Sequence, residues 1–400
     1  MKSATAVSYE LDDIAAATEE LTSQIREKMT LGKHTVAILH GQPDMEIGEL
    51  CASISRDLGC SVTGGTAAAG AILTGEGYHE LAVALHVLSD DDCLFATAIS
   101  GSMANDPEKE ITETYNAAYA SLKEQDASAE PKMIICVGTL LQSMACDNVL
   151  VKISNLCGDL PVFGYIAGDD FEFSKQQIYL DDESGGDRLS MILVAGNVKP
   201  IFTTANLQGE KALEKRLVTK AHDNVICEIE GAPAYDYIKV FPFIDDATTV
   251  LFNYQFFVEV PDDEFNDGIP VSRALSSFDK ETGEVTCFAN VPENSYIGLL
   301  YCTGNDVAAT SEKGITEFIE KMNEASGDYE YTTVLITTCS LRNMFLADMK
   351  ATEGDLVKKL FPPNLSISGL YAFGEIAPTS IQDAKAVNRF HNATFTVCAF

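Results

Sequence analysis

An internal repeat constrains this chain more than any other feature of its sequence. Three times, a short apolar run is followed by a helix-like segment and then by a second short run that ends in glycine. The apolar runs are 34–40 (HTVAILH), 133–137 (MIICV) and 333–336 (TVLI). The matching glycines, about 30 residues further along, are Gly65, Gly164 and Gly369. Because about 30 residues is the length of one strand–helix–strand crossover, we predict three such units.

Each predicted unit is followed by a stretch with strand character. These stretches are 81–88 (LAVALHVL), 189–195 (LSMILVA) and 392–400 (NATFTVCAF), the last of which alternates with a period of two. A crossover that feeds an antiparallel meander predicts an α/β fold with α+β character. We expect internally repeated strand–helix–strand plus meander units that form layered mixed sheets flanked by helices.

The middle of the chain has a different pattern, with short strand candidates from about residue 225 to 305. They are 254–260, 271–278, 285–288 and 296–302, and a hairpin turn is expected at 279–283 (DKETG). Helices are expected at 11–29, 107–122 and 306–322. We therefore expect a tail and helix over 1–32, with the first ten residues a loose tail, one domain over 33–224 and another over 225–400. The last strands, 365–400, could also pack with the N-terminal half.

The charge balance excludes several classes of partner. The chain has 27 Lys and Arg against 60 Asp and Glu, a formal net charge of −33 over 400 residues. Nucleic acids and anionic membrane surfaces would repel such a protein. No apolar run approaches the roughly 20 residues of a membrane span, and the N-terminus has no leader-like segment. The eleven cysteines are scattered without a C-x-x-C pair, so we expect free thiols, a cytoplasmic location and no metal site.

Several short motifs in a fixed order resemble one protein family. The motifs are GLYAFGEIAP at 369–378, FHNAT at 390–394, VFGYIAGDD at 162–170, AYDYI at 234–238 and VPEN at 291–294. In this order they resemble the FIST proteins, from about residue 33 to the end, with a FIST N domain (33–224) followed by a FIST_C domain (225–400). The chain departs from the family pattern at Ala372, where Thr is common, and at Asn294, where Gly is usual.

The resemblance implies a sensory protein. FIST domains are thought to bind small molecules such as amino acids and usually accompany an effector domain. Because the FIST region takes up the whole chain, the resemblance implies a stand-alone sensor that signals through a separate protein such as a kinase or cyclase. It also implies an alternative, a haem-binding nitric-oxide sensor. We expect no cofactor, and haem stays open only through this alternative.

Candidate ligand-binding residues follow from the expected ends of the strands. Ligands of open α/β sheets bind beyond the carboxyl ends of parallel strands, where glycines permit close approach. An arginine there can hold a carboxylate, an acidic side chain an amino group, and a charge among aromatic residues needs a partner. The candidates are Glu375, Arg342, Arg273, Asp169, Asp170, Gly65, Thr66, Tyr371 and Cys339. Turns, salt bridges and core packing are the competing structural interpretations of the same residues.

Two further possibilities stay open from the sequence. A haem would need an axial ligand such as His40 or His86, and no C-x-x-C-H attachment motif exists. An enzyme acting on a small metabolite could use Cys339, with His391 as a partner, or Glu375. Neither a phosphate loop nor a G-x-S-x-G motif is complete in the chain. We therefore expect a binding protein and not an enzyme.

Overall fold

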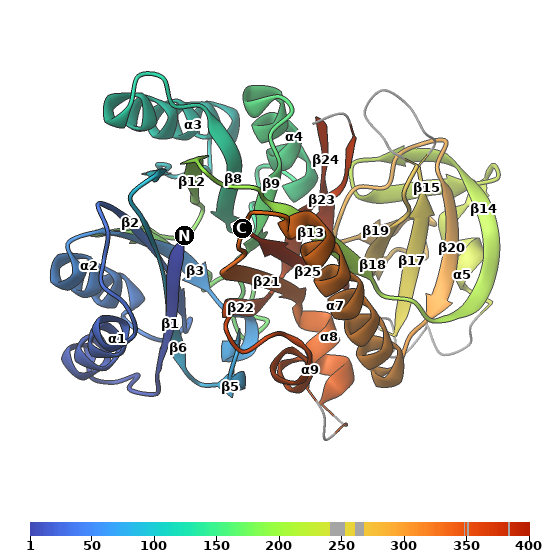
Figure 1. The fold of residues 1–400 in the computed structure, drawn as a ribbon. Coiled ribbons are helices and arrows are strands. Elements are labelled where there is room, and N and C mark those ends of the chain that lie inside the picture. The colour runs from blue at the N-terminus through green and yellow to red at the C-terminus, as the bar shows by residue number, and fades with distance from the viewer. Residues whose placement is uncertain (241–252, 261–267, 348, 350–351, 383–384) are drawn as a thin grey trace.

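The computed structural model describes residues 1–240, 253–260, 268–347, 349, 352–382 and 385–400. Three six-stranded mixed sheets form one part of the molecule, and a separate seven-stranded barrel forms the other (Figure 1). The predicted fold class, repeated units in layered mixed sheets flanked by helices, is confirmed.

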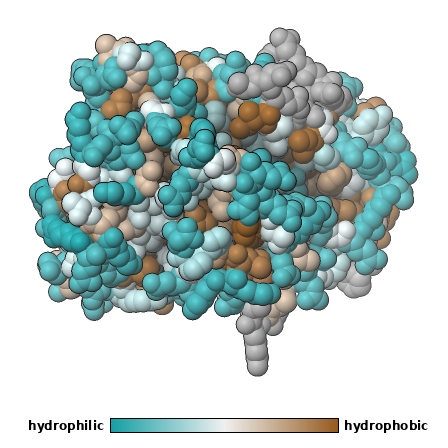
Figure 2. All heavy atoms as spheres, viewed as in Figure 1, coloured by the Kyte–Doolittle hydropathy of each residue, from teal (hydrophilic) through white to brown (hydrophobic). Residues whose placement is uncertain are grey.

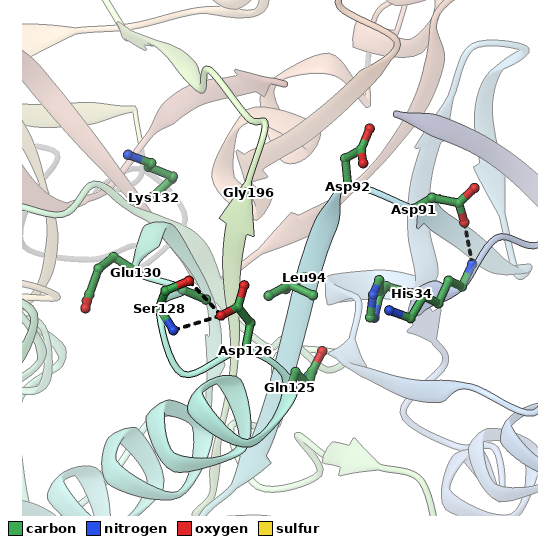
Figure 3. A pocket seen from close by; sticks show the side chains of 12 residues that line it. His34, Asp91, Asp92, Leu94, Gln125, Asp126, Ser128, Glu130, Lys132 and Gly196 are labelled. Carbon is green, nitrogen blue, oxygen red and sulfur yellow. Dashed lines mark hydrogen bonds between the residues drawn. The ribbon is translucent and has the colours of Figure 1, made fainter.

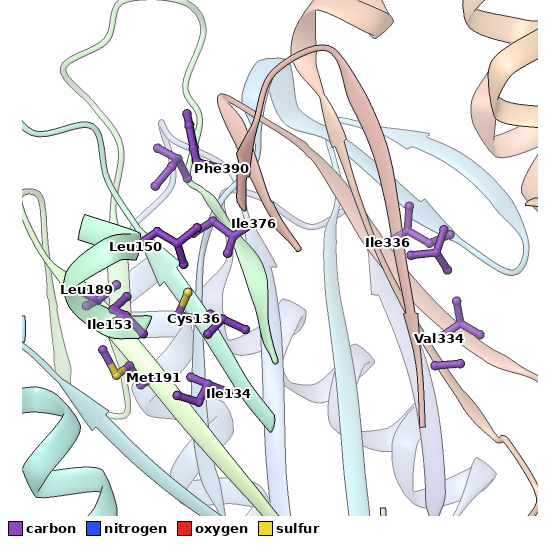
Figure 4. Close-up of a cluster of buried hydrophobic side chains, with 14 of the residues drawn as sticks. Ile134, Cys136, Leu150, Ile153, Leu189, Met191, Val334, Ile336, Ile376 and Phe390 are labelled. Carbon is purple, nitrogen blue, oxygen red and sulfur yellow. The ribbon is translucent and has the colours of Figure 1, made fainter. Parts of the chain in front are cut away.

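Each of the three sheets is built on one of the predicted crossovers. The first is β2 (His34–Gly41), α2 (Ile47–Leu58) and β3 (Ser61–Thr66); the second is β8 (Pro131–Gly138), α4 (Cys146–Cys157) and β9 (Val162–Ile166). The third is β21 (Thr333–Cys339), α8 (Ser340–Leu346), α9 (Glu353–Leu360) and β22 (Ser366–Ala372). The two strands of every crossover are parallel neighbours. An apolar stripe along each helix packs on its sheet, as Leu150 and Ile153 of α4 do in Figure 4.

The strands and helices around the crossovers also repeat. The meander strands β6 (Val83–Asp90), β12 (Leu189–Gly196) and β25 (Thr394–Ala399) pair antiparallel with the first strand of their crossover. Outside them lie β1 (Lys2–Ser8), β7 (Cys93–Ile99) and β13 (Ile201–Asn206). The helices that lead into the crossovers are α1 (Ile14–Lys28), α3 (Pro107–Gln125) and α7 (Gly304–Ser326). Each unit therefore contributes four strands to its own six-stranded sheet, with the leading helix and the crossover helices beside them.

A cyclic exchange of hairpins locks the three units together. The hairpin of the first unit, β4 (Ala71–Thr74) and β5 (Gly77–Glu80), follows the turn η1 (Ala68–Gly70) and pairs with β22 of the third. That of the second, β10 (Ile178–Leu180) and β11 (Glu183–Gly185), pairs with β3 of the first. That of the third, β23 (Gly374–Gln382) and β24 (Lys385–His391), pairs with β9 of the second. Since each sheet is completed by another unit, no unit has a complete sheet alone.

The barrel is an insertion into the third unit, between β13 and α7. Its elements are β14 (Glu210–His222), β15 (Val225–Ile229), β16 (Ala232–Pro233), α5 (Ala234–Ile238), β17 (Tyr254–Glu259), β18 (Val271–Phe278), β19 (Val285–Cys287) and β20 (Tyr296–Tyr301). The barrel closes because β14 pairs with both β20 and β15. Its short strands and the turn at 279–283 agree with the sequence pattern, whereas the polar strand β14 had no recognisable pattern.

The N-terminus corrects one expectation. The first ten residues are not a loose tail, because β1 pairs with β6 from Lys2 and Ser89 through to Ser8 and Val83. The strand has no large apolar side chain except Val7, so its sequence carries little hydrophobic signal. Its Ala4 and Ala6 are nevertheless buried on alternate positions, as a half-buried strand requires.

The glycines of the repeat lie inside strands and not in ligand-facing loops. A Cβ atom at Gly64 would lie 1.9 Å from the carbonyl oxygen of Leu39, and one at Gly164 would lie 1.8 Å from that of Cys136. The corresponding distance at Gly369 is 2.5 Å, to the oxygen of Ile336. Close approach of the parallel neighbour therefore demands glycine at the same place in every unit. The equivalent residue in the first unit is Gly64, not Gly65.

Candidate functional site

An apolar cavity lies where the second unit, the third unit and the barrel meet. It is formed at the carboxyl ends of the crossover strands by ten residues: Leu140, Phe171, Phe173, Ala274, Phe288, Cys339, Ser340, Leu341, Phe373 and Asn392. Segments that follow β8, β9, β21 and β22 all contribute, which is where α/β sheets bind ligands. Its volume of about 30 Å³ is close to that of one water molecule, so a larger ligand enters only if a side chain moves.

Four of the ten lining residues are phenylalanines, and they come from three segments of the chain. The ring centroids of Phe173 and Phe373 are 4.8 Å apart, and those of Phe171 and Phe373 are 5.7 Å apart. Phe173 also stacks on Phe288 beyond β19, at 6.4 Å and an interplanar angle of 26°. These separations are typical of attractive aromatic pairs. The rings therefore join the loop after β9 to the barrel and to the third unit.

The loop after β9 holds two of these rings in an unusual conformation. Phe171 and Phe173 have φ angles of 62° and 56°, in the left-handed region that bulky residues rarely adopt. The loop is anchored by Asp169, whose carboxylate accepts hydrogen bonds from the backbone N–H groups of Phe173, Ser174 and Lys175 at 2.9 to 3.0 Å. Asp169 is completely buried, and all three donors belong to its own loop.

Glu375 neighbours Cys339, a lining residue, but does not itself line the cavity. Its side chain is completely buried, and its Oε2 accepts hydrogen bonds from Oγ1 and N–H of Thr394 at 2.6 and 3.2 Å. Among the described residues, Oε1 has no hydrogen-bond partner. Burial raises the pKa of Glu375 to about 8, while Thr394, Arg342 and the adjacent Cys339 thiol act to lower it. The carboxyl group is therefore mostly protonated and uncharged at neutral pH.

Arg342 is engaged elsewhere. It is completely buried, and its Nε and Nη2 contact Oε1 of Glu353 at 2.9 Å. Its remaining N–H groups donate to Ser311 and Thr310 and to the carbonyl oxygen of Ala393. The guanidinium group is thus surrounded by protein acceptors, and Arg342 does not line the cavity.

Arg273 joins the barrel to the second unit. It lies on β18, and its guanidinium group contacts Asp147 of α4 at 3.2 Å. It also donates to the carbonyl oxygens of Asn290 and Phe390 at 2.7 and 3.0 Å. Arg273 is 4% exposed and, like Arg342, finds its partners within the protein.

Apart from Cys339, the other predicted residues are not among those that line the cavity. Thr66 donates to the carbonyl oxygen of Gly168 at 2.7 Å and so fixes the base of the loop after β9, and Gly65 precedes it on β3. Asp170 is exposed, and Tyr371 packs edge-on against Tyr78.

The thiol of Cys339 does line the cavity. Burial raises its pKa well above the usual value, and the neighbouring Glu375 adds to this. A thiol in this state is a poor nucleophile.

Neither of the two candidate haem ligands reaches the aromatic cavity. His40 and His86 are buried within the first unit's sheet, and burial lowers the pKa of each to about 3. Neither lines the aromatic cavity, which is also far smaller than the several hundred Å³ of a typical cofactor pocket. Within the described ranges no three His, Cys, Asp or Glu side chains are grouped as metal ligands.

The opposite ends of the strands offer a different kind of hollow. At the amino ends of β2 and β8, a broad depression is bordered by Asp91, Asp92, Asp126 and Glu130, together with Lys33 and Lys132 (Figure 3). It is polar and open, like most of the visible surface, where hydrophilic residues predominate (Figure 2). Charged side chains border this depression, whereas none of the residues that line the aromatic cavity is charged.

The sequence interpretation missed the aromatic residues of the cavity. Phe171, Phe173, Phe288 and Asn392 were not among the candidates, although Phe171 and Phe173 directly follow the selected Asp169 and Asp170. The pattern D-D-F-E-F, with two large apolar residues in an expected loop, is a signal that could have identified them.

Comparisons with known proteins place the chain in a family. The model of the FIST N domain matches residues 6–232, and that of the FIST C domain matches residues 237–378. No curated protein matches the chain. Among solved structures, the one described as PurLQS from Thermotoga maritima aligns with 99% of this chain and 71% of that chain, at 10% identity and a TM-score of 0.21.

No helix in the described part of the chain combines the length and apolarity needed to span a bilayer.

The two family matches together cover almost the whole chain and follow each other in the expected order. The chain therefore belongs to the FIST family of sensory signal-transduction domains.

Proposed function

We propose that this protein senses a small molecule that binds in the aromatic cavity between the second unit, the third unit and the barrel. The observation that carries the proposal is the convergence of four strand-end segments and the barrel on one apolar cavity. Next to its lining residue Cys339 lies a buried carboxyl group, Glu375, with a strongly raised pKa. Strand-end loops and carboxyl groups with a perturbed pKa both recur at the binding sites of α/β proteins.

Ligand binding in this cavity could change the arrangement of the barrel and the sheets, because both contribute to its lining. Ala274 and Phe288 belong to the barrel, whereas Phe373 and Cys339 belong to the third unit. A ligand that separates or draws together these walls would alter the position of the barrel relative to the sheets. The changed surface would be read by a separate signalling protein, such as a kinase or cyclase.

Two alternatives have less support. A haem-binding nitric-oxide sensor would need an axial ligand at a large cavity, and His40 and His86 lie within a sheet away from the aromatic one. An enzyme that uses Cys339 would need an activated thiol, but burial and Glu375 raise the pKa of this one. Glu375 itself has an acid–base pKa suited to catalysis, although it does not line the cavity.

A thermal-shift screen tests the proposal. The panel contains amino acids, small carboxylates, aromatic compounds and haem, and a saturable rise in melting temperature identifies binding. Filling the cavity with Ala274→Leu or Leu341→Phe should abolish the rise while melting without ligand stays cooperative. Tyr296→Ala, at a 48% exposed residue of the barrel, serves as the control. Unchanged shifts in both filled variants, or no saturable shift with any class, would contradict the proposed function.

A further inference from the structure

Phe173 occupies the cavity in the way that a bound molecule would. Its ring lies between Phe373, at 4.8 Å, and Phe288, at 6.4 Å, although the side chain remains 47% exposed. An apolar ring that stays half exposed gains only part of the free energy that full burial in a core would give. The ring is also supplied by a loop residue at φ 56°, a conformation that costs free energy for phenylalanine.

The lining of the cavity carries no charge. None of the ten lining residues is acidic or basic, in a chain with 87 charged residues, 27 basic and 60 acidic. Moving a charged ligand from water into such surroundings would be unfavourable, because no lining side chain can pair with it. The nearby guanidinium of Arg342 is paired with Glu353, so it provides no compensating charge for an anion.

Two buried polar side chains of the lining suit a single hydrogen bond to a ligand. Asn392 and Ser340 are the polar side chains of the lining. The amide of Asn392 donates to the carbonyl oxygen of His391 and accepts from the N–H of Ala274, which leaves one further N–H and one lone pair, and Ser340 has a hydroxyl group. A ring that bears one N–H or O–H group would match this combination of apolar walls and two polar side chains.

We infer that the cavity binds an uncharged, planar aromatic molecule, and that Phe173 is the intramolecular occupant which this molecule displaces. The inference rests on the proposed function and specifies the ligand class of the same site. Displacement would release the loop after β9, while Asp169 keeps its base anchored through the N–H groups of Ser174 and Lys175. Displacement of the Phe173 ring by a ligand would thereby change the conformation, and so the exposed surface, of the loop after β9.

Four probes with the same ring separate charge from shape. Indole is uncharged, tryptamine is a cation, indole-3-acetate is an anion, and tryptophan is a zwitterion. The chain contains no tryptophan but 14 tyrosines, so indole emission excited on the long-wavelength side of the tyrosine absorption band reports the binding of each probe. We expect indole to bind, and each charged probe to bind at least about tenfold more weakly, as expected for burying an unpaired charge.

Two variants distinguish an occupant from a wall. Phe173→Ala removes the competing ring, so indole should bind up to about tenfold more tightly, the value of one aromatic pair. Phe373→Leu keeps the apolar volume but removes the ring on which the ligand would stack, and it should weaken binding by a similar factor. Tyr296→Ala removes an equally exposed aromatic side chain elsewhere and should change nothing.

The outcomes separate this inference from the proposed function. Weaker binding of indole to Phe173→Ala would show that Phe173 is a wall, and tighter binding of a charged probe would show that the site accepts charge; either overturns the inference. If no indole probe binds but another class gives a shift that Ala274→Leu abolishes, the ligand class is wrong and the sensor function stands. If no class binds at all, both fail.

Discussion

Two buried carboxyl groups of the third unit, Glu353 beside Arg342 and Glu375 beside the cavity, differ in how completely their oxygen atoms are hydrogen-bonded. Around Arg342, the partner Glu353 is completely buried and its two oxygens receive hydrogen bonds from Arg342, Ser311 and Thr338. Around the cavity, Glu375 is equally buried but has one oxygen without a partner. The first arrangement is complete and supports the fold. The second leaves a buried carboxyl oxygen without a hydrogen bond. Buried polar atoms without partners are rare in folded proteins and often belong to functional sites.

The largest expected loss of stability comes from breaking the ion pair between Arg342 and Glu353. Arg342→Met would leave Glu353 buried without its counter-ion and should lower the free energy of unfolding by about 3–5 kcal/mol. Chemical denaturation measures the loss. The double variant Arg342→Met with Glu353→Met should recover most of it, because no buried charge remains. A loss below about 1 kcal/mol for the single variant would mean that the ion pair is not the basis of the difference.

The pH dependence of the free energy of unfolding should reveal the titration of Glu375. Glu375 has a pKa raised from 4.5 to about 8 in the folded protein, so between these values the folded state holds a proton that the unfolded state has released. Its contribution is fully present below pH 4.5 and is lost as the pH rises towards 8, at up to about 1.4 kcal/mol per pH unit.

Glu375→Gln is the matched control for this slope, because glutamine is isosteric and does not titrate. The difference in unfolding free energy between the wild type and Glu375→Gln should therefore shift in favour of the variant from about pH 5 to pH 8. Denaturation curves across this range measure it. Parallel profiles for the two proteins would show that Glu375 titrates normally.

A pair of hydroxyl deletions sharpens the comparison. Thr338 donates to Glu353 at 2.9 Å, and Thr394 donates to Glu375 at 2.6 Å. A hydrogen bond to an ion-paired carboxylate contributes about 1.5–3 kcal/mol, and one to an uncharged group about 0.5–1.5 kcal/mol. At pH 6, Thr338→Val should therefore destabilise the protein more than Thr394→Val does, by urea denaturation. The reverse order would contradict the assigned charge states.

The smallest effect is expected at Phe173. Phe173→Asn removes a half-exposed ring and places at φ 56° a residue that tolerates the left-handed region. The lost contacts and the relieved strain should nearly cancel, so the free energy of unfolding should change by about 0.5 kcal/mol or less. Urea denaturation of this variant beside Tyr296→Ala provides the measure. A loss above about 2 kcal/mol would make Phe173 a structural member of the core.

Much of the fold could be predicted because its signals are local. Apolar runs such as 34–40 and 133–137 show strands by themselves, and the spacing to glycine shows the crossovers. The strands β1 and β14 could not be predicted, since β1 buries mainly small alanines and β14 is largely polar. Their partners, β6 and β20, decide that they are strands.

The candidate site was only half visible in the sequence. Glu375 and Cys339 were identified because a charge among aromatic residues and a residue at a strand end are local patterns. Arg342 looked like a ligand-binding residue because its partner, Glu353, is eleven positions away on another helix. The phenylalanines at 171, 173, 288 and 373 meet only after the barrel docks on the sheets.

The sequence by itself determined the number of repeated units, the family and the strongly acidic character of the chain, because each depends on residues close together or on a sum over all residues. The tertiary structure alone decided which hairpin completes which sheet, and which buried charges are paired. Those outcomes depend on contacts between segments that meet only in the folded chain, such as β4 with β22, Arg273 with Asp147, and Arg342 with Glu353. The cavity is one of them, because no single unit of the chain encloses it.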